Sequence, residues 1–203
     1  MGVLRKLTGW LAKRRSANPR RFWERQYGDP EAGRNWASDV RLGFYEFAAE
    51  SLPKERLRIL DLGSGLGYGG KRLAEICPLW QVEGFEISRA AVEKAVIPTH
   101  CGDLTKDPIP AGYDYLLLIQ TLEHFRNPDA ILSRVVLAAR RGVVVTVPYK
   151  GKLNQKHLAS LDESSFSGYR GASIGLRKRV YEKNGSLKTD MRVHIPAGPE
   201  TAG

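Results

Sequence analysis

The residues best suited to chemistry begin in the stretch RILDLGSGLG at 58–67, where an apolar run ends in an acid. Asp61 stands directly before three alternating glycines, which are Gly63, Gly65 and Gly67. Glycine lets a ligand approach the backbone closely, and a carboxylate attracts a cationic amine. The stretch therefore predicts a binding site for a ligand that carries such an amine.

Two further acids stand at comparable places along the chain. Glu86 is the last residue of the predicted strand 81–86, and Asp103 follows a short predicted strand near 98–102. A carboxylate in the first position can accept hydrogen bonds from both hydroxyls of a ribose, and one in the second can accept from an exocyclic amine such as that of adenine. Three acids beside a glycine loop favour a nucleoside-type ligand over a set of unrelated surface acids.

A nicotinamide dinucleotide is the rival ligand, because Gly65-x-Gly67-x-x-Gly70 formally satisfies the dinucleotide fingerprint. Glu86, 16 residues beyond Gly70, has an acceptable spacing for the ribose acid. Asp61 argues against this ligand, since a pyrophosphate beside it would be repelled.

Hydrophobic periodicity predicts how these residues are positioned. Apolar runs predict strands, and the segments between them predict helices, with Ser88 and Asn127 or Pro128 opening two of the helices. The predicted strands are 57–62, 81–86, 98–102, 113–120 and 142–148, and the predicted helices are 68–76, 89–96 and 127–139. Because strands alternate with helices and are apolar on both faces, we expect a parallel sheet covered on both sides.

Asn184-Gly185 separates two alternating runs within 177–195 and predicts an antiparallel hairpin at the end of the sheet. The expected fold class is α/β: a Rossmann-like, doubly wound, mostly parallel sheet in a three-layer sandwich with a C-terminal antiparallel β-hairpin. We expect a basic amphipathic helical segment at 1–26 and a single domain over 27–203.

The motifs ILDLGSGLG, GFEIS, CGDL and YDYLLLIQTLEHFRNPDAIL resemble, in order and spacing, those of class I S-adenosylmethionine-dependent methyltransferases, from about residue 57 to 148. The resemblance is closest to small-molecule enzymes with Leu-Glu-His after the fourth strand. It implies that S-adenosyl-L-methionine is the cofactor. The residues that it implies for cofactor binding are Asp61, Gly63, Ser64, Gly65, Gly67, Glu86, Ile87, Asp103, Leu104 and Gln120.

The upstream segment FWERQYGDPEAGRNW also looks like the aromatic segment with which many of these enzymes close over the cofactor. Tyr27 and Trp36 are the candidates, because an aromatic face attracts a sulfonium cation. Packing of these aromatics against the domain is an equally good explanation of their presence.

Methyl transfer to a hydroxyl benefits from a base that removes the acceptor's proton. His124 and His157 are two of only four histidines and both follow predicted strand ends, so we take them as catalytic candidates. Glu123 is a third candidate, as the residue that orients His124, and Tyr149 is a candidate for lining the acceptor pocket. A structural role for each histidine is the alternative.

The residues after the fourth strand constrain the class of acceptor. Adenine and cytosine aminomethyltransferases carry Asn/Asp-Pro-Pro-Tyr there, whereas this chain has QTLEH, so a nucleic-acid acceptor is disfavoured. We expect no metal site, since two acids and an Asn at metal-ligand spacing are missing. The segment after the fifth strand resembles enzymes that modify glycans and lipid-linked sugars, which favours a small-molecule or glycan acceptor.

Charge is concentrated at the ends of the chain, although the net charge is +10. Residues 1–26 hold eight Lys/Arg and one acid, while the middle of the chain is close to neutral. In VLRKLTGWLAKRR, at 3–15, leucines share one helical face beside basic residues, which is compatible either with contact with an anionic membrane or with packing on the domain. No secretory signal is recognisable, and two cysteines, Cys77 and Cys101, are too few for a disulfide framework. We therefore expect a cytoplasmic protein, which would be peripheral at the inner face of the membrane if residues 3–15 bind that membrane.

The leading hypothesis is an S-adenosylmethionine-dependent enzyme that O-methylates a small-molecule or glycan acceptor. A non-catalytic protein that binds the same cofactor and acts in assembly is the second, and an NAD-dependent oxidoreductase is the third. The oligomeric state is not indicated by the sequence.

Overall fold

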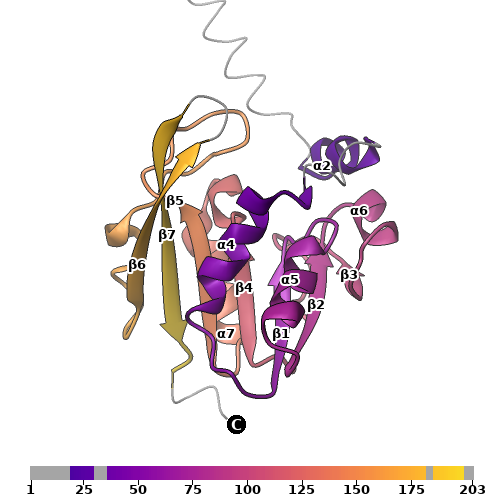
Figure 1. Ribbon diagram of the computed structural model, residues 1–203, viewed down its shortest axis with the longest axis horizontal. Coiled ribbons are helices and arrows are strands. Elements are labelled where there is room, and N and C mark those ends of the chain that lie inside the picture. The colour runs from indigo at the N-terminus through magenta and orange to yellow at the C-terminus, as the bar shows by residue number, and fades with distance from the viewer. Residues whose placement is uncertain (1–18, 30–35, 182–184, 199–203) are drawn as a thin grey trace, which may run out of the picture.

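The computed structural model describes residues 19–29, 36–181 and 185–198, and in this part of the chain seven strands form one mixed sheet (Figure 1). The order across the sheet is β3-β2-β1-β4-β5-β7-β6. Strands β1 to β5 are parallel, and β7 is antiparallel to both β5 and β6. The strands are β1 Leu57–Leu62, β2 Trp80–Glu86, β3 Thr99–Cys101, β4 Tyr115–Ile119, β5 Gly142–Pro148, β6 Ser173–Tyr181 and β7 Ser186–Pro196.

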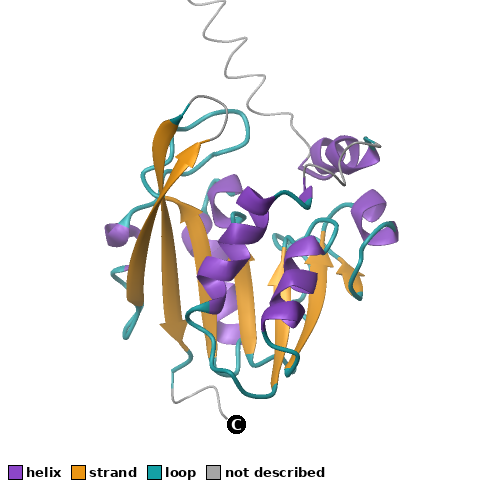
Figure 2. Ribbon diagram, viewed as in Figure 1, coloured by secondary structure: helices purple, strands orange, loops and turns teal. Residues whose placement is uncertain are grey.

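Helices cover both faces of the sheet, which gives the three layers expected (Figure 2). Helices α4 and α5 lie on one face and α7 on the other, whereas α2 and α6 lie together near the carboxyl ends of β2 and β3 (Figure 1). The helices are α2 Pro19–Gly28, α4 Asp39–Ala49, α5 Tyr68–Ile76, α6 Arg89–Glu93 and α7 Pro128–Ala138, with short 3-10 turns η1 Leu122–His124 and η2 Glu163–Phe166. The Rossmann-like fold class is confirmed.

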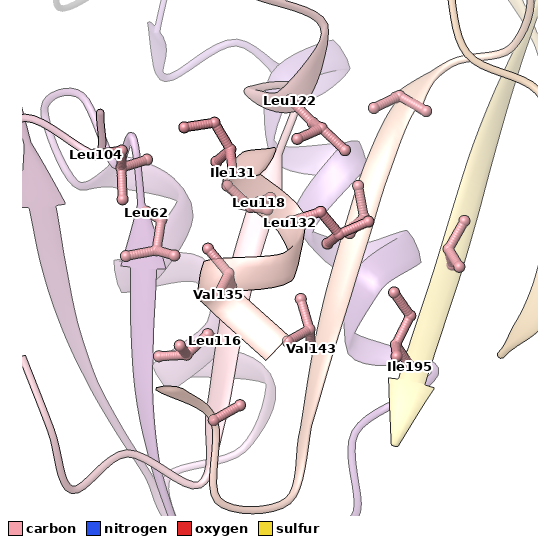
Figure 3. Packing of buried hydrophobic residues seen from close by; sticks show 14 of the residues in the cluster. Leu62, Leu104, Leu116, Leu118, Leu122, Ile131, Leu132, Val135, Val143 and Ile195 are labelled. Atoms are coloured by element: carbon pink, nitrogen blue, oxygen red, sulfur yellow. The ribbon is translucent and has the colours of Figure 1, made fainter. Parts of the chain in front are cut away.

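The central strand β4 is buried on both faces because its side chains alternate between two hydrophobic clusters. Leu116 and Leu118 belong to the cluster under α7, which Figure 3 shows, and Leu117 belongs to the cluster under α4 and α5. Each such side chain, removed from water, contributes about 1.5–3 kcal/mol. The buried sheet is therefore a rigid base for the loops at its carboxyl edge.

The predicted elements occur where the sequence placed them, with shifted ends. Ser88 caps α6 by accepting from the Ala91 N–H at 3.2 Å, and Asn127 caps α7 in the same way through Ala130. The predicted helix 89–96 ends at Glu93, and the final hairpin begins at Ser173, earlier than predicted. Helix α4 was not predicted from the sequence.

The β6–β7 hairpin continues past the end of its neighbour. β5 pairs with β7 only as far as Pro148 opposite Asp190, whereas β6 and β7 remain paired to Tyr181 opposite Ser186. Residues 178–181 and 186–189 thus stand beyond the carboxyl edge of the parallel strands, on the left of Figure 1. The predicted membrane-contacting residues 3–15 and the turn residue Asn184 lie outside the described residues. Among the residues described, no helix has the length and apolar character needed to cross a membrane.

Candidate active site

The glycine loop after β1 lies where the strand order reverses between β1 and β4, the position at which α/β sheets bind ligands. Gly63, Gly65 and Gly67 have φ values of +81°, +56° and +79°, a conformation that side chains other than glycine rarely adopt. A Cβ at Gly65 would lie 2.7 Å from the Tyr27 hydroxyl oxygen. All three positions therefore favour glycine because of the turn, and Gly65 is also required by the tyrosine ring that covers it.

Asp61 is fully buried at the end of β1 and does not itself line the cleft. Its Oδ2 accepts from the Tyr45 hydroxyl at 2.9 Å, and Oδ1 has no partner in the described part of the chain. Burial raises the pKa of Asp61 to about 7, which the Tyr45 hydrogen bond opposes. Tyr45, from α4, stands between this carboxylate and the cleft that it lines.

Glu86, at the end of β2, lines the cleft and is held by backbone donors. Its two carboxylate oxygens accept from the N–H groups of Gly65 and Ser88, both at 2.9 Å. Burial raises the pKa of Glu86, although these two N–H groups act in the opposite direction. The carboxylate is thereby fixed in place, and its remaining lone pairs can accept from hydroxyl groups of a ligand.

Asp103 and Leu104 line the cleft after β3. Asp103 Oδ1 accepts from the N–H of Thr105 at 2.9 Å and from its hydroxyl at 2.6 Å. Although burial raises the pKa of Asp103, these bonds and the charge of Lys106 keep it below its ordinary value. Asp103 is therefore ionised, and part of its acceptor capacity is used by its own turn.

Gln120, at the end of β4, has a strained backbone with φ of +52°. Its side chain lines the cleft, and its Nε2 is buried without a partner among the described residues. The Ser64 hydroxyl, in the glycine loop, is in the same condition. Two such polar groups beside a cleft are what a polar ligand would satisfy.

An aromatic wall formed by α2 and by Trp36, three residues before α4, lines the cleft. Trp23 stacks on Tyr27 with ring centroids 5.9 Å apart, and Tyr27 lies 5.1 Å from Trp36. Glu24 holds α2 in this position, since its carboxylate accepts from the Arg89 and Ala90 N–H groups at the start of α6. The ligand-facing aromatics are thus carried by a helix anchored to α6.

The three catalytic candidates lie together next to the aromatic wall, since the ring centroid of His124 is 5.1 Å from that of Trp23. His124 and Glu123 come from η1, and His157, from the loop after β5, has its ring centroid 5.4 Å from that of His124. His124 Nδ1 lies 3.0 Å from the Lys156 carbonyl oxygen, which assigns the ring proton to Nδ1 and leaves Nε2 able to accept one. All three residues line the cleft.

Burial also sets the protonation of these groups. It lowers the pKa of His124 to about 4, against the effect of the Lys156 carbonyl, so the ring is neutral near pH 7. It raises the pKa of Glu123 to about 8, with the Asp190 charge adding to the effect. Glu123 therefore carries a proton at neutral pH, and its Oε2 has no partner among the described residues.

The cleft has a volume of about 700 Å³, within the rough range of 300–1,000 Å³ typical of small-molecule sites. The residues predicted for the site that line it are Tyr27, Gly63, Ser64, Gly65, Glu86, Ile87, Asp103, Leu104, Gln120, Glu123, His124 and His157. Asp61 and Gly67 lie behind it, and Tyr149 packs against the cluster under α7. The described residues hold no group of three or more His, Cys, Asp or Glu arranged to bind a metal.

Sequence reasoning missed several residues that line this cleft. Tyr45 and Phe44 lie on the unpredicted helix α4, Trp23 lies one helical turn before Tyr27, and Arg179 reaches the cleft from β6. Trp23 could have been found from its spacing of four residues from Tyr27, which places both on one face of a helix.

The fold and this cleft define the class: a Rossmann-like domain with its ligand site at the carboxyl edge of the sheet. Residues 33–159 match the family model described as "Methyltransferase domain". The chain therefore belongs to this family of class I S-adenosylmethionine-dependent methyltransferases, and S-adenosylmethionine is the family's cofactor.

Solved structures with the same fold differ in their reactions. The cyclase SpnF matches with a TM-score of 0.62 and 17% identity over 79% of this chain and 82% of its own. Magnesium protoporphyrin IX methyltransferase of Synechocystis PCC 6803, with bound S-adenosylhomocysteine, matches with a TM-score of 0.59 and 18% identity over 85% of this chain and 92% of its own. The N-terminal domain of EvdMO1, in the presence of S-adenosylhomocysteine and D-fucose, matches with a TM-score of 0.55 and 17% identity over 79% of this chain and 85% of its own. No curated protein matches the chain significantly in sequence.

Proposed function

We propose that this chain binds S-adenosylmethionine in the cleft and transfers its methyl group to a hydroxyl of a small-molecule or glycan acceptor. The observation that carries the proposal is the pair of buried carboxylates, Asp61 and Glu86, on either side of a loop of positive-φ glycines. Ser64 and Gln120 line the cleft with polar atoms that have no partner among the described residues, and Asp61, behind the cleft, has an oxygen in the same condition, which fits an amino-acid and ribose ligand better than an apolar one.

When bound, S-adenosylmethionine would supply a methyl group on a sulfonium, which an acceptor oxygen would attack in line with the departing sulfur. The chain's own contribution is then alignment and exclusion of water. The rings of Trp23, Tyr27 and Trp36 would shield the cleft and offer aromatic faces to a cation. Glu86 would accept from ribose hydroxyls, and Asp103 with Leu104 would line the adenine end.

His124 is the proposed base, since it is neutral at pH 7 with an unprotonated Nε2. Glu123, protonated at that pH, would donate a hydrogen bond to the acceptor or orient it, and His157 would complete the wall beside His124. Because burial also weakens His124 as a base, an acceptor hydroxyl of lowered pKa would suit it best.

Calorimetry separates this function from an oxidoreductase. The wild-type protein is titrated with S-adenosylhomocysteine and with NAD, beside the variants Glu86→Gln and Glu83→Gln. Glu83 lies on the same strand, and its carboxylate accepts from the Tyr113 hydroxyl at 2.8 Å outside the cleft, which makes it a matched control. We expect S-adenosylhomocysteine alone to bind, Glu86→Gln to weaken it about tenfold or more, and Glu83→Gln to leave it within twofold. Binding of NAD in its place would refute the proposal.

A non-catalytic cofactor-binding protein is the second candidate. The cyclase SpnF, whose name gives a reaction other than methyl transfer, indicates that this fold is not restricted to methyltransferases. Transfer of a labelled methyl group to a panel of sugars and phenols distinguishes the two. His124→Ala should keep its affinity for S-adenosylhomocysteine and lose transfer at least a hundredfold. Cofactor binding by the wild type without transfer to any acceptor of this panel would favour the second candidate.

A further inference from the structure

Arg179 gives the cleft a cationic group that the chemistry of methyl transfer does not require. It lies on β6 in the part of the hairpin that overhangs the sheet, and it lines the cleft with its guanidinium carbon 4.9 Å from the Phe44 ring centroid. Its Nε donates to Asp190 Oδ2 at 2.7 Å. Its Nη1 is buried without a partner in the described part of the chain.

The charges around Arg179 leave a positive excess. Asp190, which is fully buried, is the carboxylate nearest to both Arg179 and Arg177, whose Nη2 lies 3.9 Å from Asp190 Oδ2. One carboxylate thus serves two guanidinium groups. Arg177 also donates to the Gly43 carbonyl at 2.9 Å and does not line the cleft. Of the two arginines, Arg179 is therefore the one that a ligand in the cleft can reach.

The position of Asp190 relates this charge to the catalytic candidates. The β6 backbone stands four strands away from the β1 backbone, about 19 Å at the usual spacing of strands, although the Arg179 side chain itself reaches back to Phe44 of α4. Asp190, its partner, is close enough to Glu123 to raise the pKa of that side chain. Arg179 therefore belongs with Glu123 and His124, where an acceptor would react.

We infer that Arg179 binds an anionic group of the acceptor, a carboxylate or a phosphate. A guanidinium presents paired N–H donors that match both oxygens of such a group, and a buried unpaired donor gains from being satisfied. Asp190 fixes the guanidinium through Nε, which leaves the Nη donors for the ligand. The inference rests on the proposed function, because it names the class of acceptor for that site.

The test is calorimetric titration of the full-length protein, saturated with S-adenosylhomocysteine, with inorganic phosphate and separately with acetate. The variants are Arg179→Met, which keeps the length of the side chain without its charge, and Arg179→Lys, which keeps the charge. Arg177→Met is the matched control, since Arg177 shares Asp190 but does not line the cleft. The same titrations are made without S-adenosylhomocysteine, so that loss of the cofactor site is recognised separately.

We expect the wild type to bind at least one of the two anions saturably. Preference for phosphate over acetate, or the reverse, distinguishes a phosphate site from a carboxylate site. Arg179→Met should weaken that binding about tenfold or more, as loss of a charged hydrogen bond does, while Arg179→Lys and Arg177→Met retain it. Affinity for S-adenosylhomocysteine should stay within twofold in every variant. If the wild type binds neither anion, if Arg179→Met binds them unchanged, or if Arg179→Met loses S-adenosylhomocysteine instead, the inference is wrong. A failure of the wild type to bind S-adenosylhomocysteine would overturn the proposed function, while the titrations without it would still report on Arg179.

Discussion

Replacing Glu123 by Gln should make the protein more stable at alkaline pH, although Glu123 lies in the candidate active site. The carboxyl group is buried, and burial raises its pKa from 4.5 to about 8. Because the folded-state pKa lies above the unfolded-state one, the folded protein holds a proton that the unfolded chain releases between these two values. The free energy of unfolding therefore falls as pH rises through this window, and the loss is complete above about pH 8.

The magnitude depends on the width of the window. A difference of about 3.5 pH units at about 1.4 kcal/mol per unit corresponds to about 5 kcal/mol, and relaxation of the site reduces this to about 3–5 kcal/mol. The amide of Glu123→Gln does not titrate, so the variant escapes this loss. For a domain of this size the difference corresponds to about 10 °C in Tm.

Urea unfolding of wild type and Glu123→Gln at a series of pH values from 5 to 8.5 measures the effect. Asp61, whose pKa is raised to about 7, destabilises both proteins alike, so their difference isolates Glu123. Glu93→Gln, an exposed substitution on α6, is the control and should parallel the wild type. Stability curves of wild type and Glu123→Gln that run parallel across this range would refute the reasoning about burial.

Three further outcomes are expected. Gly65→Ala, strained by its positive φ and blocked by the tyrosine above the loop, should lose about 1–2 kcal/mol of stability and most of its affinity for S-adenosylhomocysteine in calorimetry, whereas Gly168→Ala, with open space around it, should lose neither. With His124 as the base, kcat/KM should not rise above about pH 6, because the pKa of His124 is about 4, and it should fall with a midpoint near 8 as Glu123 loses the proton that it donates. A rise with a midpoint near 8 would instead identify ionised Glu123 as the base. If residues 3–15 contact an anionic membrane and do not pack on the domain, deletion of residues 2–15 should abolish binding to anionic liposomes without changing cofactor affinity, and unchanged liposome sedimentation would refute membrane contact through this segment.

The sheet could be predicted because its signals are local. Apolar runs such as 142–148, glycine after β1 and a capping residue such as Ser88 each act over a few neighbours. Helix α4 could not, because Gly43 interrupts its pattern and glycine disfavours a helix interior. Packing does not require this glycine, since a Cβ there would lie 3.8 Å from the Arg177 guanidinium, an ordinary van der Waals contact.

The site residues that stand at or after strand ends could be predicted from the sequence. Arg179, whose position depends on the pairing register of β6 and β7, could not. Parallel strands bring Glu86, Asp103 and Gln120 to one edge whatever the details of packing, so type and position sufficed for them. Arg179 faces the cleft only because β6 and β7 stay paired beyond the end of β5. A shift of one residue would turn that side chain to the opposite face, and the sequence does not encode such a register visibly.

Two buried acids with unpaired oxygens, Asp61 and Glu123, connect the energetics of folding to function. Each has its pKa raised by burial, and each retains an oxygen without a partner among the described residues, which makes both unfavourable for folding at neutral and alkaline pH. Groups that cost stability are retained where a ligand satisfies them. Asn in place of Asp61, or Gln in place of Glu123, should therefore stabilise the free protein and weaken what it binds, the cofactor in the first case and the acceptor in the second. A purely structural acid would show no such opposition between stability and binding.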